Sequence, residues 1–351
     1  LCFFHRKSTK KYRIPCFIIT FVAQKSYMNR LEQIKRPISA EFEVFKQKFD
    51  ASLQSSNPLL GEVINFIKQR NGKMMRPMLA LLMAKLCGEI KDSTYYAAIS
   101  LELLHTASLV HDDVVDESDK RRGQSSVNAV YDNKVSVLVG DYLLATSLTN
   151  AALTADVQLV ELVSRLGQAL SEGEIIQLSN TNASDFSEDV YFDVIRKKTA
   201  ALFSTASEAG ARSVKCTDEM AQKAALFGEL IGIAFQIKDD IFDYYTSDVL
   251  GKPTGNDMKE GKLTLPSLYV LNTLKDESMI ALALKIRSLE ATDEEIAQFI
   301  EYVKSNGGIE YATKVMKGYR DKAIEVLPST ASQDLKDALI SFIDYVIERK
   351  K

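Results

Sequence analysis

Apolar residues recur at intervals of three and four along most of this chain, which is the spacing of one buried face of an α-helix. The clearest helical segments are residues 51–69, 95–116, 135–154, 157–178, 218–245 and 293–305. No segment keeps a two-residue alternation long enough to predict a strand. Predicted breaks fall where Gly, Pro, Asn and Ser cluster, at residues 71–72, 122–123, 180–187, 250–257 and 306–308. The pattern predicts an all-α protein.

Composition favours one large soluble enzyme domain. The chain is 46% hydrophobic and has only 7 Pro and 16 Gly in 351 residues, so it can bury a large core and rarely interrupts its helices. We find no repeat and no linker, and we therefore expect a single helical bundle over residues 28–351. The 44 basic and 47 acidic residues nearly balance, which gives no electrostatic argument for a nucleic-acid partner. The four cysteines show no C-x-x-C spacing and indicate free thiols in a reducing compartment.

Residues 1–27 differ from the rest of the chain. No acidic residue precedes Glu32, and a cluster of basic residues at 5–13 is followed by an apolar run at 14–23. That run is too short to span a bilayer. We interpret residues 1–27 as a disordered, non-native or leader extension without function, and Met28 as the true start. A genuine leader would instead direct the protein to an organelle.

Two copies of one acidic pattern carry most of the functional information. They are Asp112-Asp113-Val114-Val115-Asp116 and Asp239-Asp240-Ile241-Phe242-Asp243, each within an apolar helical segment. On a helix, the first and last Asp of each motif lie one turn apart on one face, about 6 Å along the axis. Carboxylate oxygens suit Mg²⁺, which completes its octahedron with waters and substrate phosphates. A single motif can be a helix cap or a solvated face, but two copies in apolar helices favour a metal–diphosphate site across a cavity.

The helix of the first motif also carries His105 and Ser108 on the face of Asp112 and Asp116. A His above a metal-binding carboxylate can donate to a phosphate oxygen, although a hydrogen-bonded core His is the simpler interpretation. Glu102 and His105 also form an E-x-x-H pattern that suggests a di-iron bundle. That site requires a second E-x-x-H, and the three His of the chain do not supply one, so the di-iron interpretation fails.

Basic residues near the predicted breaks indicate two anion sites. Lys120, Arg121 and Arg122 follow the first motif by one turn, where guanidinium groups can reach phosphates held by the metals. Lys73 and Arg76 lie at a predicted helix start, a favourable place for an anion. Lys198, Lys252 and Lys262 stand alone near polar breaks. Any one of these basic residues, considered singly, is most simply a solvent-exposed surface charge. Together they predict one anion site built on metals and one built on Lys and Arg.

These motifs resemble those of the trans-polyprenyl (isoprenyl) diphosphate synthases, from about Leu31 to the C-terminus. The matching elements occur in the family's order: Gly72-Lys73-Met74-Met75-Arg76-Pro77, His105 through Gly123, Gly173-Glu174-Ile175-Ile176-Gln177, Lys198-Thr199, Phe235 through Asp240, Gly251-Lys252-Pro253 and Gly261-Lys262. Asn71 departs from the pattern, since the family commonly has Gly there. The resemblance implies an isoprenoid synthase fold, which is a helical bundle around a deep central cavity.

The resemblance also implies a mechanism. Asp112, Asp116, Asp239 and Asp243 would hold two to three Mg²⁺ ions on the diphosphate of an allylic substrate, which leaves to give an allylic carbocation. The double bond of isopentenyl diphosphate attacks this cation, and the released diphosphate removes the proton. The enzyme contributes orientation, charge and exclusion of water.

The implied roles of the other residues follow from the same resemblance. Arg121, Lys198 and Lys252 would steady the departing diphosphate, and Thr199 and Lys262 would assist in binding. The non-metal site for isopentenyl diphosphate would comprise Lys73, Arg76, His105 and Arg122. Gln236 shares a helix face with Asp239 and Asp243 and would act near the cation.

Product length depends on what lies below the aspartates. One isoprene unit is about as long as one helical turn, roughly 5 Å, so Ser108 and its neighbour Ala107, one turn below Asp112, act as a gate. In the family, small residues at these places resemble longer-chain enzymes. Leu159 and Val163 share the face of Gln177 and point deeper. We predict a product of six to nine isoprene units (C30–C45) for a quinone side chain, with geranylgeranyl diphosphate as the main competitor and ordinary helix packing as the simplest role of all four residues.

Two other classes remain open. A class I terpene cyclase uses one Asp-rich motif with a different second metal motif, whereas this chain repeats D-D-x-x-D. A non-catalytic subunit of a heteromeric synthase lacks acidic or basic elements that this chain retains. The resemblance implies a homodimer. We expect no transmembrane segment, a transient membrane contact for product release and a cytoplasmic location.

Overall fold

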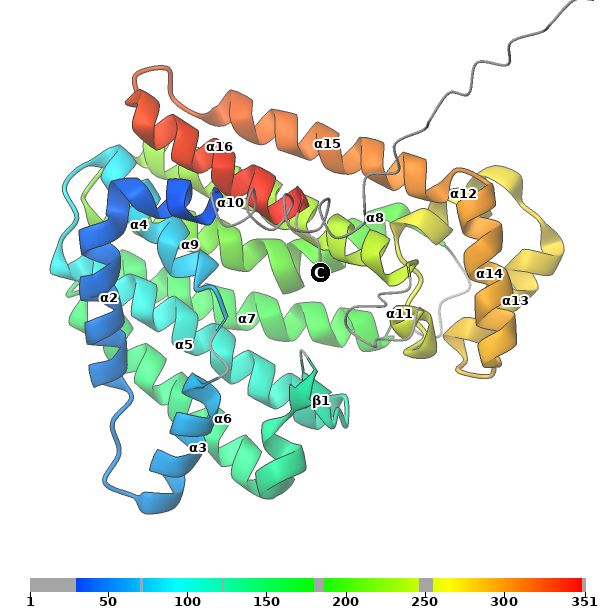
Figure 1. The fold of residues 1–351 in the computed structure, drawn as a ribbon, viewed down its shortest axis with the longest axis horizontal. Coiled ribbons are helices and arrows are strands. Elements are labelled where there is room, and N and C mark those ends of the chain that lie inside the picture. The colour runs from blue at the N-terminus through cyan, green and yellow to red at the C-terminus, as the bar shows by residue number, and fades with distance from the viewer. Residues whose placement is uncertain (1–29, 70–71, 122, 180–185, 246–254, 349–351) are drawn as a thin grey trace, which may run out of the picture.

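The computed structural model describes residues 30–69, 72–121, 123–179, 186–245 and 255–348, which form a bundle of helices (Figure 1). The first half contains η1 (Arg36–Ile38), α2 (Ser39–Ser52), α3 (Pro58–Lys68), α4 (Met75–Cys87), α5 (Asp92–Val115), α6 (Val127–Leu153) and α7 (Val157–Ser179). Between α5 and α6, β1 (Lys120–Arg121) pairs antiparallel with β2 (Gln124–Ser125). The all-α prediction is therefore confirmed, with one small ribbon added.

The second half continues the bundle and adds a group of shorter helices at one end. Its elements are α8 (Glu188–Ile195), a π-helical turn η3 (Arg196–Ala200), α9 (Ala201–Ser213), α10 (Asp218–Asp243), α11 (Asn256–Lys259), α12 (Leu265–Leu274), α13 (Glu277–Arg287), α14 (Asp293–Ser305), α15 (Gly308–Val326) and α16 (Gln333–Glu348). Helices α12 to α14 gather at one end of the molecule, and α15 and α16 lie along one side (Figure 1).

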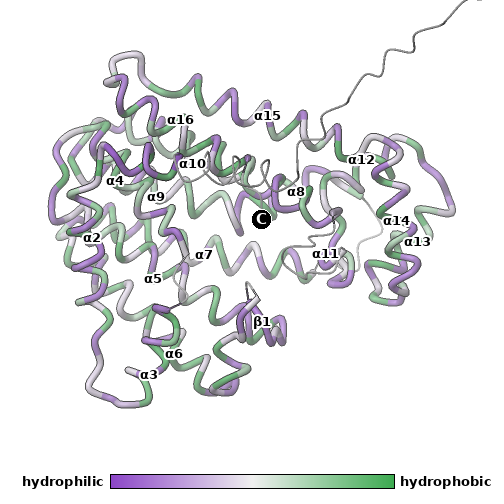
Figure 2. The backbone as a smooth tube through the Cα atoms, in the orientation of Figure 1, coloured by the Kyte–Doolittle hydropathy of each residue, from purple (hydrophilic) through white to green (hydrophobic). Residues whose placement is uncertain are grey.

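Helices α5 and α10 organise the centre of the bundle. α5 packs against α4, α6, α7 and α9, and α10 packs against α9 and α15. Hydrophobic and hydrophilic residues alternate in short stretches along the helices, as amphipathic helices require (Figure 2). Gly228 of α10 lets the backbones approach closely, because an added Cβ would lie 2.2 Å from the carbonyl oxygen of Phe203 on α9.

A second, smaller core lies between α5, α6, α7 and α9. We call it the α5–α7–α9 cluster, and its buried members are Ala97, Leu101, Leu104, Ala151, Leu159, Val163, Leu166, Leu202, Ala206 and Ala209. It contains both Leu159 and Val163, each 1% exposed.

One predicted helix is wrong. Residues 51–69 are divided, because α2 ends at Ser52 and α3 begins only at Pro58. Asn57 caps α3 by accepting a hydrogen bond from the N–H of Leu60 at 3.1 Å, and Pro58 occupies the first turn. Both are strong helix-start signals that the three-four periodicity does not register.

Other helix boundaries follow the predictions closely. α14 has the predicted bounds, and α7 extends the predicted helix by one residue. α6 begins at Val127 but contains a kink at Asp132, whose φ of 72° is not helical. The Asp132 carboxylate accepts a hydrogen bond from the N–H of Val135 at 3.0 Å. It thus caps the regular part of the helix, which starts at the predicted Val135.

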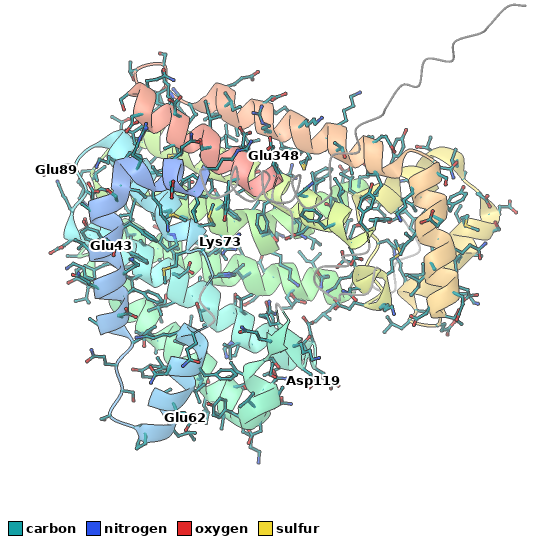
Figure 3. All side chains as sticks on the ribbon, viewed as in Figure 1. Glu43, Glu62, Lys73, Glu89, Asp119 and Glu348 are labelled. Carbon is teal, nitrogen blue, oxygen red and sulfur yellow. The ribbon has the colours of Figure 1, made fainter. Side chains whose placement is uncertain are left out.

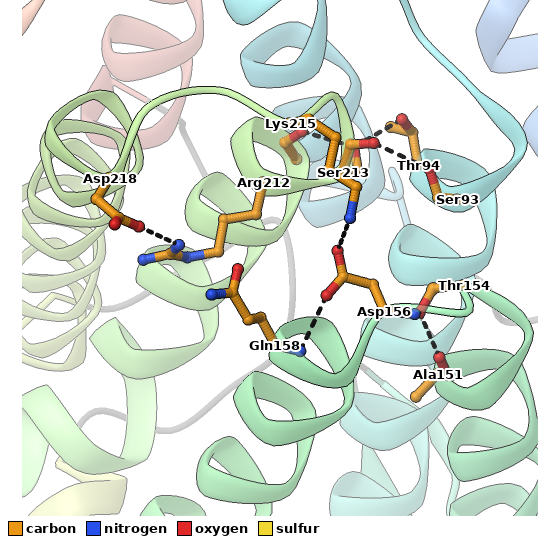
Figure 4. Close-up of polar contacts among 11 residues, drawn as sticks. Ser93, Thr94, Ala151, Thr154, Asp156, Gln158, Arg212, Ser213, Lys215 and Asp218 are labelled. Atoms are coloured by element: carbon orange, nitrogen blue, oxygen red, sulfur yellow. Dashed lines mark hydrogen bonds and ion pairs between the residues drawn. The ribbon is translucent and has the colours of Figure 1, made fainter.

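A polar corner ties the start of α7 to the loop between α9 and α10 (Figure 4). Lys215 forms an ion pair with Asp156, whose other oxygen accepts from the N–H of Gln158 at 3.0 Å. Arg212 contacts Asp218 at 2.8 Å. Burial raises the pKa of Asp156, but the hydrogen bonds from Lys215 and from backbone N–H groups outweigh it and leave the pKa below its usual value. The corner joins α7, α9 and α10, three helices that also contribute residues to the wall of a central cavity.

Candidate active site

The two aspartate motifs lie at the C-terminal ends of α5 and α10 and face one cavity. Asp112, Asp116, Asp239 and Asp243 all line a cavity of about 1120 Å³. The C-terminal end of a helix carries a partial negative charge, so carboxylates there gain nothing from the helix dipole. Interaction with the helix dipole therefore does not explain these residues. The prediction of a central cavity between the motifs is confirmed.

Asp112 lies in a mixed electrostatic environment. Burial raises the pKa of its carboxyl, Lys198 and Arg121 act to lower it, and Glu174 and Asp116 act to raise it. The net effect is a raised pKa. Burial is the largest of these effects, so the surroundings disfavour the ionised form of Asp112.

Lys198 reaches the cavity from the π-helical turn η3. Such turns are rare and occur often at functional sites, because they change the direction of side chains along a helix. Lys198 forms an ion pair with Glu174 of α7, and its Nζ lies 3.4 Å from the side-chain oxygen of Gln177. Gly173 permits this approach of α7 and η3, since an added Cβ would lie 3.1 Å from the backbone nitrogen of Lys198.

Thr199 and Gln236 form the start of a hydrogen-bond chain in the cavity wall. The Thr199 hydroxyl donates to Gln236 Oε1 at 2.8 Å, and Gln236 Nε2 donates to Asp240 Oδ1 at 2.8 Å. The Tyr191 hydroxyl donates to Asp240 Oδ2 at 2.5 Å. Asp240 is 2% exposed, and burial raises its pKa to about 7 despite these hydrogen bonds.

Arg121 lies in β1 beside the first motif. Its Nε donates to Asp113 Oδ1 at 2.7 Å, so the second Asp of the motif orients a cation. Burial raises the pKa of Asp113, and Arg121 only partly offsets this effect. Arg121 and Lys120 both line the cavity. Arg122 lies outside the described residues.

Asp243 has a contact that the sequence did not predict. Its two carboxylate oxygens accept hydrogen bonds from the N–H groups of Asn256 and Asp257, at 3.0 and 3.1 Å, and thereby connect α10 to α11. Its metal-binding role stays a prediction, in competition with this contact.

Lys262 forms an ion pair with Glu260. Burial acts to lower the pKa of Lys262, but Glu260, Asp116 and Asp257 together outweigh it and leave the pKa raised. Lys252 lies outside the described residues.

The predicted non-metal site is partly assembled in the same cavity. Arg76 and His105 line it, and the Arg76 guanidinium lies 5.1 Å from the centroid of the Phe203 ring. Lys73, labelled in Figure 3, has its Nζ 5.0 Å from the centroid of the Tyr345 ring on α16. Asn71 lies outside the described residues.

The residues predicted to control product length occupy different places. Ser108 lines the cavity, and its hydroxyl donates to the carbonyl of His105 at 2.9 Å. Ala107 is buried in the main core at 2% exposure. Leu159 and Val163 lie in the α5–α7–α9 cluster. This cluster adjoins the cavity, because its member Leu202 also lines the cavity wall.

A second cavity of about 560 Å³ adjoins the first. The two share lining residues that include Asp116, Lys198, Thr199 and Gln236. The second cavity is also lined by α8, by Lys262 and by apolar residues of α12 and its surroundings. Residues that are candidates for binding a diphosphate thus lie on the wall that the two cavities share.

The donor set suits Mg²⁺ bound together with a diphosphate. Among the described residues, no three acidic, Cys or His side chains are grouped tightly enough to hold a metal by themselves. Mg²⁺ seldom needs such a cage, because it binds one or two carboxylates and fills its octahedron with waters and substrate phosphates. Asp112 and Asp116 on one wall with Asp239 on the other provide such an arrangement.

Comparison with known proteins decides the family. A family model described as "Polyprenyl synthetase" matches residues 57–303. The chain is 34% identical over 330 residues to an octaprenyl diphosphate synthase of Haemophilus influenzae, a match that covers 93% of this chain and 99% of that protein. The chain belongs to the polyprenyl synthetase family.

Solved structures of this family show the same fold. A geranylgeranyl pyrophosphate synthase from Bacteroides thetaiotaomicron is 52% identical, with a TM-score of 0.81 over 92% of this chain and 100% of that chain. A decaprenyl diphosphate synthase from Rhodobacter capsulatus is 33% identical, with a TM-score of 0.84 over 91% of this chain and 98% of that chain. The resemblance drawn from the motifs is confirmed, and this polyprenyl synthetase is a prenyltransferase.

Sequence reasoning missed several residues of this polyprenyl synthetase site. Glu174 and Gln177 contact Lys198, and Asp113 contacts Arg121; all three lie in the motifs that identified the family, so only their roles were missed. Tyr191 and Asp257 lie outside those motifs, so no motif pointed to them. Tyr191 precedes its partner Asp240 by 49 residues, and only the fold brings the two together.

Proposed function

We propose that this prenyltransferase condenses an allylic diphosphate with isopentenyl diphosphate, with Mg²⁺, and repeats the step to make a trans-polyprenyl diphosphate. The observation that carries the proposal is that the two D-D-x-x-D motifs, 127 positions apart, line one cavity together with Arg76, His105 and Lys198. This cavity combines carboxylates for metals with cations for phosphates, as two diphosphate substrates require.

Asp112, Asp116 and Asp239 would hold the Mg²⁺ ions, with Asp243 as a further candidate. Bound Mg²⁺ neutralises a diphosphate and makes it a better leaving group. Lys198 would exchange its ion pair with Glu174 for an oxygen of the diphosphate, and Arg121, held by Asp113, would present its remaining N–H groups to the same anion. Lys252 and Lys262 complete the proposed set on this side.

Thr199 and Gln236 would face the allylic cation. The Thr199 proton is donated to Gln236, so the Thr199 oxygen can present lone pairs to the cavity, and so can Gln236 Oε1. Fixed oxygen dipoles near a developing cation stabilise the transition state more than the ground state. Isopentenyl diphosphate would bind through Arg76 and His105, with Lys73 and Arg122 as the remaining proposed contacts.

For product length, we propose a long chain of six to nine isoprene units for a quinone side chain. Ser108 leaves the cavity wall small one turn below Asp112, and the α5–α7–α9 cluster provides an apolar end to the cavity. Along α5, about 16 Å of helix, or roughly three isoprene lengths, separates Ser108 from Ala97 of this cluster, a depth that by itself favours a product nearer to geranylgeranyl length. Geranylgeranyl diphosphate is the second candidate, favoured by the relative of that name at 52% identity.

We also propose that the enzyme is a homodimer that pairs through α6. Apolar side chains on the outer face of this helix are exposed, including Val137, Leu138 and Leu148 at 40%, 68% and 46%. Several exposed apolar side chains on one helix are typical of an interface between subunits.

The described helices include none that is long and apolar enough to cross a membrane. A long prenyl product would still require contact with a membrane surface, which we propose to be transient. We propose the cytoplasm as the site of the reaction, for which the absence of C-x-x-C spacing among the four cysteines is the sequence support. Residues 1–27, predicted to be an extension, lie outside the described residues.

One incubation tests the reaction. Purified protein is mixed with Mg²⁺, farnesyl diphosphate and radiolabelled isopentenyl diphosphate, and products are separated by chromatography with and without phosphatase treatment. Labelled prenyl diphosphates of increasing length support the proposal. A product without diphosphate would indicate a cyclase, and no turnover in the presence of both substrates would indicate a non-catalytic subunit.

A further inference from the structure

A chain of three hydrogen bonds connects the buried hydroxyl of Tyr191 to the wall of the active-site cavity. It runs from Tyr191 on α8 to Asp240, from Asp240 to Gln236 on α10, and from Gln236 to Thr199 on η3. Its donor–acceptor distances are 2.5, 2.8 and 2.8 Å. Tyr191 lines only the second cavity among the two described here, whereas Thr199 and Gln236 line both. Tyr191 therefore lies behind the residues that would face the substrate.

The polarity of this chain is fixed at Asp240. In its ionised form the Asp240 carboxylate only accepts hydrogen bonds, and this form holds the NH₂ group of Gln236 toward Asp240 Oδ1 and the Gln236 Oε1 toward Thr199. The opposite orientation of the amide would place two oxygens against each other. With the observed orientation, the cavity wall presents oxygen rather than NH₂, which is the polarity that a carbocation needs.

Tyr191 holds the other oxygen of Asp240. Asp240 is 2% exposed, and a buried carboxylate oxygen that loses its donor costs more than the hydrogen bond itself contributes. Without the Tyr191 hydroxyl, Asp240 Oδ2 loses this donor, and the carboxylate that constrains Gln236 is held less firmly. Burial and the neighbouring Asp240 raise the pKa of Tyr191, which keeps its proton in place as a donor.

We propose that Tyr191 is a positioning residue for the prenyl transfer step, which acts through Asp240 to set the orientation of the Gln236 amide. The inference rests on the proposed function of the cavity. The ring of Tyr191 also packs edge-on against Phe192 at 5.3 Å between centroids, which is a purely structural contribution. Tyr191→Phe retains this ring and removes only the hydroxyl, so the two roles can be separated.

The test compares Tyr191→Phe with a matched control, Tyr311→Phe. The Tyr311 hydroxyl also donates to a carboxylate of α8, that of Glu188, at 2.9 Å. We expect Tyr191→Phe to lower kcat about tenfold with KM for both substrates within twofold, since a positioning group contributes less than a direct contact, whose loss costs about 10²–10³. Tyr311→Phe should leave both constants unchanged. An unchanged kcat in Tyr191→Phe, or an equal loss in both variants, overturns the proposal.

A double-mutant cycle then tests whether Tyr191 acts through Gln236. In a Gln236→Leu background, the further change Tyr191→Phe should alter kcat by less than twofold, because the group that it positions is gone. A full tenfold loss in that background overturns the proposal. If Tyr191→Phe does not fold, as judged by circular dichroism, the cycle is performed with Tyr191→His in its place, and a full loss in the Gln236→Leu background again overturns the proposal. Absence of turnover in the unmodified enzyme would instead contradict the proposed function.

Discussion

Lys198 forms an ion pair with Glu174 in the wall of the cavity, with side-chain exposures of 28% and 18%. The ammonium group that would bind a diphosphate is therefore paired with a carboxylate of the protein itself. Glu174 also acts to raise the pKa of Asp112. The negative charge of Glu174 therefore opposes the binding of a diphosphate near Lys198 and the ionisation of Asp112, which is proposed to hold the metal. If Lys198 binds the diphosphate as proposed, this pair is exchanged for the substrate.

Glu174→Gln should therefore tighten the binding of the allylic substrate. Removing one nearby negative charge changes the interaction by about 1 kcal/mol at the effective dielectric of a protein site, which corresponds to roughly a fivefold lower KM. Initial rates against allylic diphosphate concentration measure this effect. Glu172→Gln is the control, because Glu172 pairs with Lys197 at 3.8 Å and is 64% exposed. A higher KM in Glu174→Gln would show that Glu174 instead holds Lys198 in its working position.

Ser108→Phe should shorten the product. The phenyl ring would fill the cavity one turn below Asp112 and stop the growing tail there. Chromatography should therefore show products at least one isoprene unit shorter. Ser164→Phe serves as the control: Ser164 lies on α7, is exposed, and bonds its own helix backbone at 2.9 Å as Ser108 does. An unchanged product distribution in Ser108→Phe would show that the tail takes another path.

Asp156→Asn should destabilise the fold at neutral pH but not in acid. The folded-state pKa of Asp156 lies below its value in the unfolded chain, which is about 3.9. Its contribution is therefore present above that pH and is lost as the pH falls through the folded pKa. After solvent screening we expect about 0.5–1 kcal/mol at pH 7. Urea unfolding at pH 7 and pH 3 measures it.

Glu43→Gln provides the reference for that experiment, since Glu43 and Lys46 form an exposed pair at 2.6 Å. Its effect should be near zero at both pH values. An Asp156→Asn difference that persists unchanged at pH 3 would assign the loss to packing rather than to charge.

Leu138→Glu should produce monomers if α6 forms the dimer interface. Leu138 is 68% exposed, and a charge at the centre of an apolar interface opposes association. Sedimentation measures the mass of each variant. Leu284→Glu on α13 is the control, with a leucine that is 40% exposed away from α6. Dimers in both variants would place the interface elsewhere.

The parts of this fold that depend on local signals could be predicted from the sequence. The aspartates of α5 and α10 were found because each motif repeats a local spacing on a helix. The break at Asn57 was missed even though Asn-Pro is a local signal, because the surrounding apolar residues continue the helical period across it. Periodicity alone outweighed the turn chemistry there.

The parts that depend on the fold could not be predicted. The ion pair of Glu174 with Lys198 forms because a π-helical turn redirects Lys198 toward α7, and three-four spacing carries no sign of that turn. The contact of Asp243 with the start of α11 bridges residues 13 and 14 positions apart. Leu159 and Val163 were placed on the right helix, but their burial in the α5–α7–α9 cluster follows from packing between helices.

Calorimetric titration with inorganic diphosphate tests the central claim most directly, because it measures the metal-dependent anion site without requiring turnover. The unmodified enzyme should bind diphosphate with Mg²⁺ and at least about 100-fold more weakly without it, since Asp112, Asp116 and Asp239 would hold the ions and the ions would supply positive charge to the phosphates. Asp112→Ala and Asp239→Ala should each abolish the Mg²⁺-dependent binding while helicity persists, and Asp337→Ala on α16 should not. Undiminished Mg²⁺-dependent binding in both Asp112→Ala and Asp239→Ala would contradict the account.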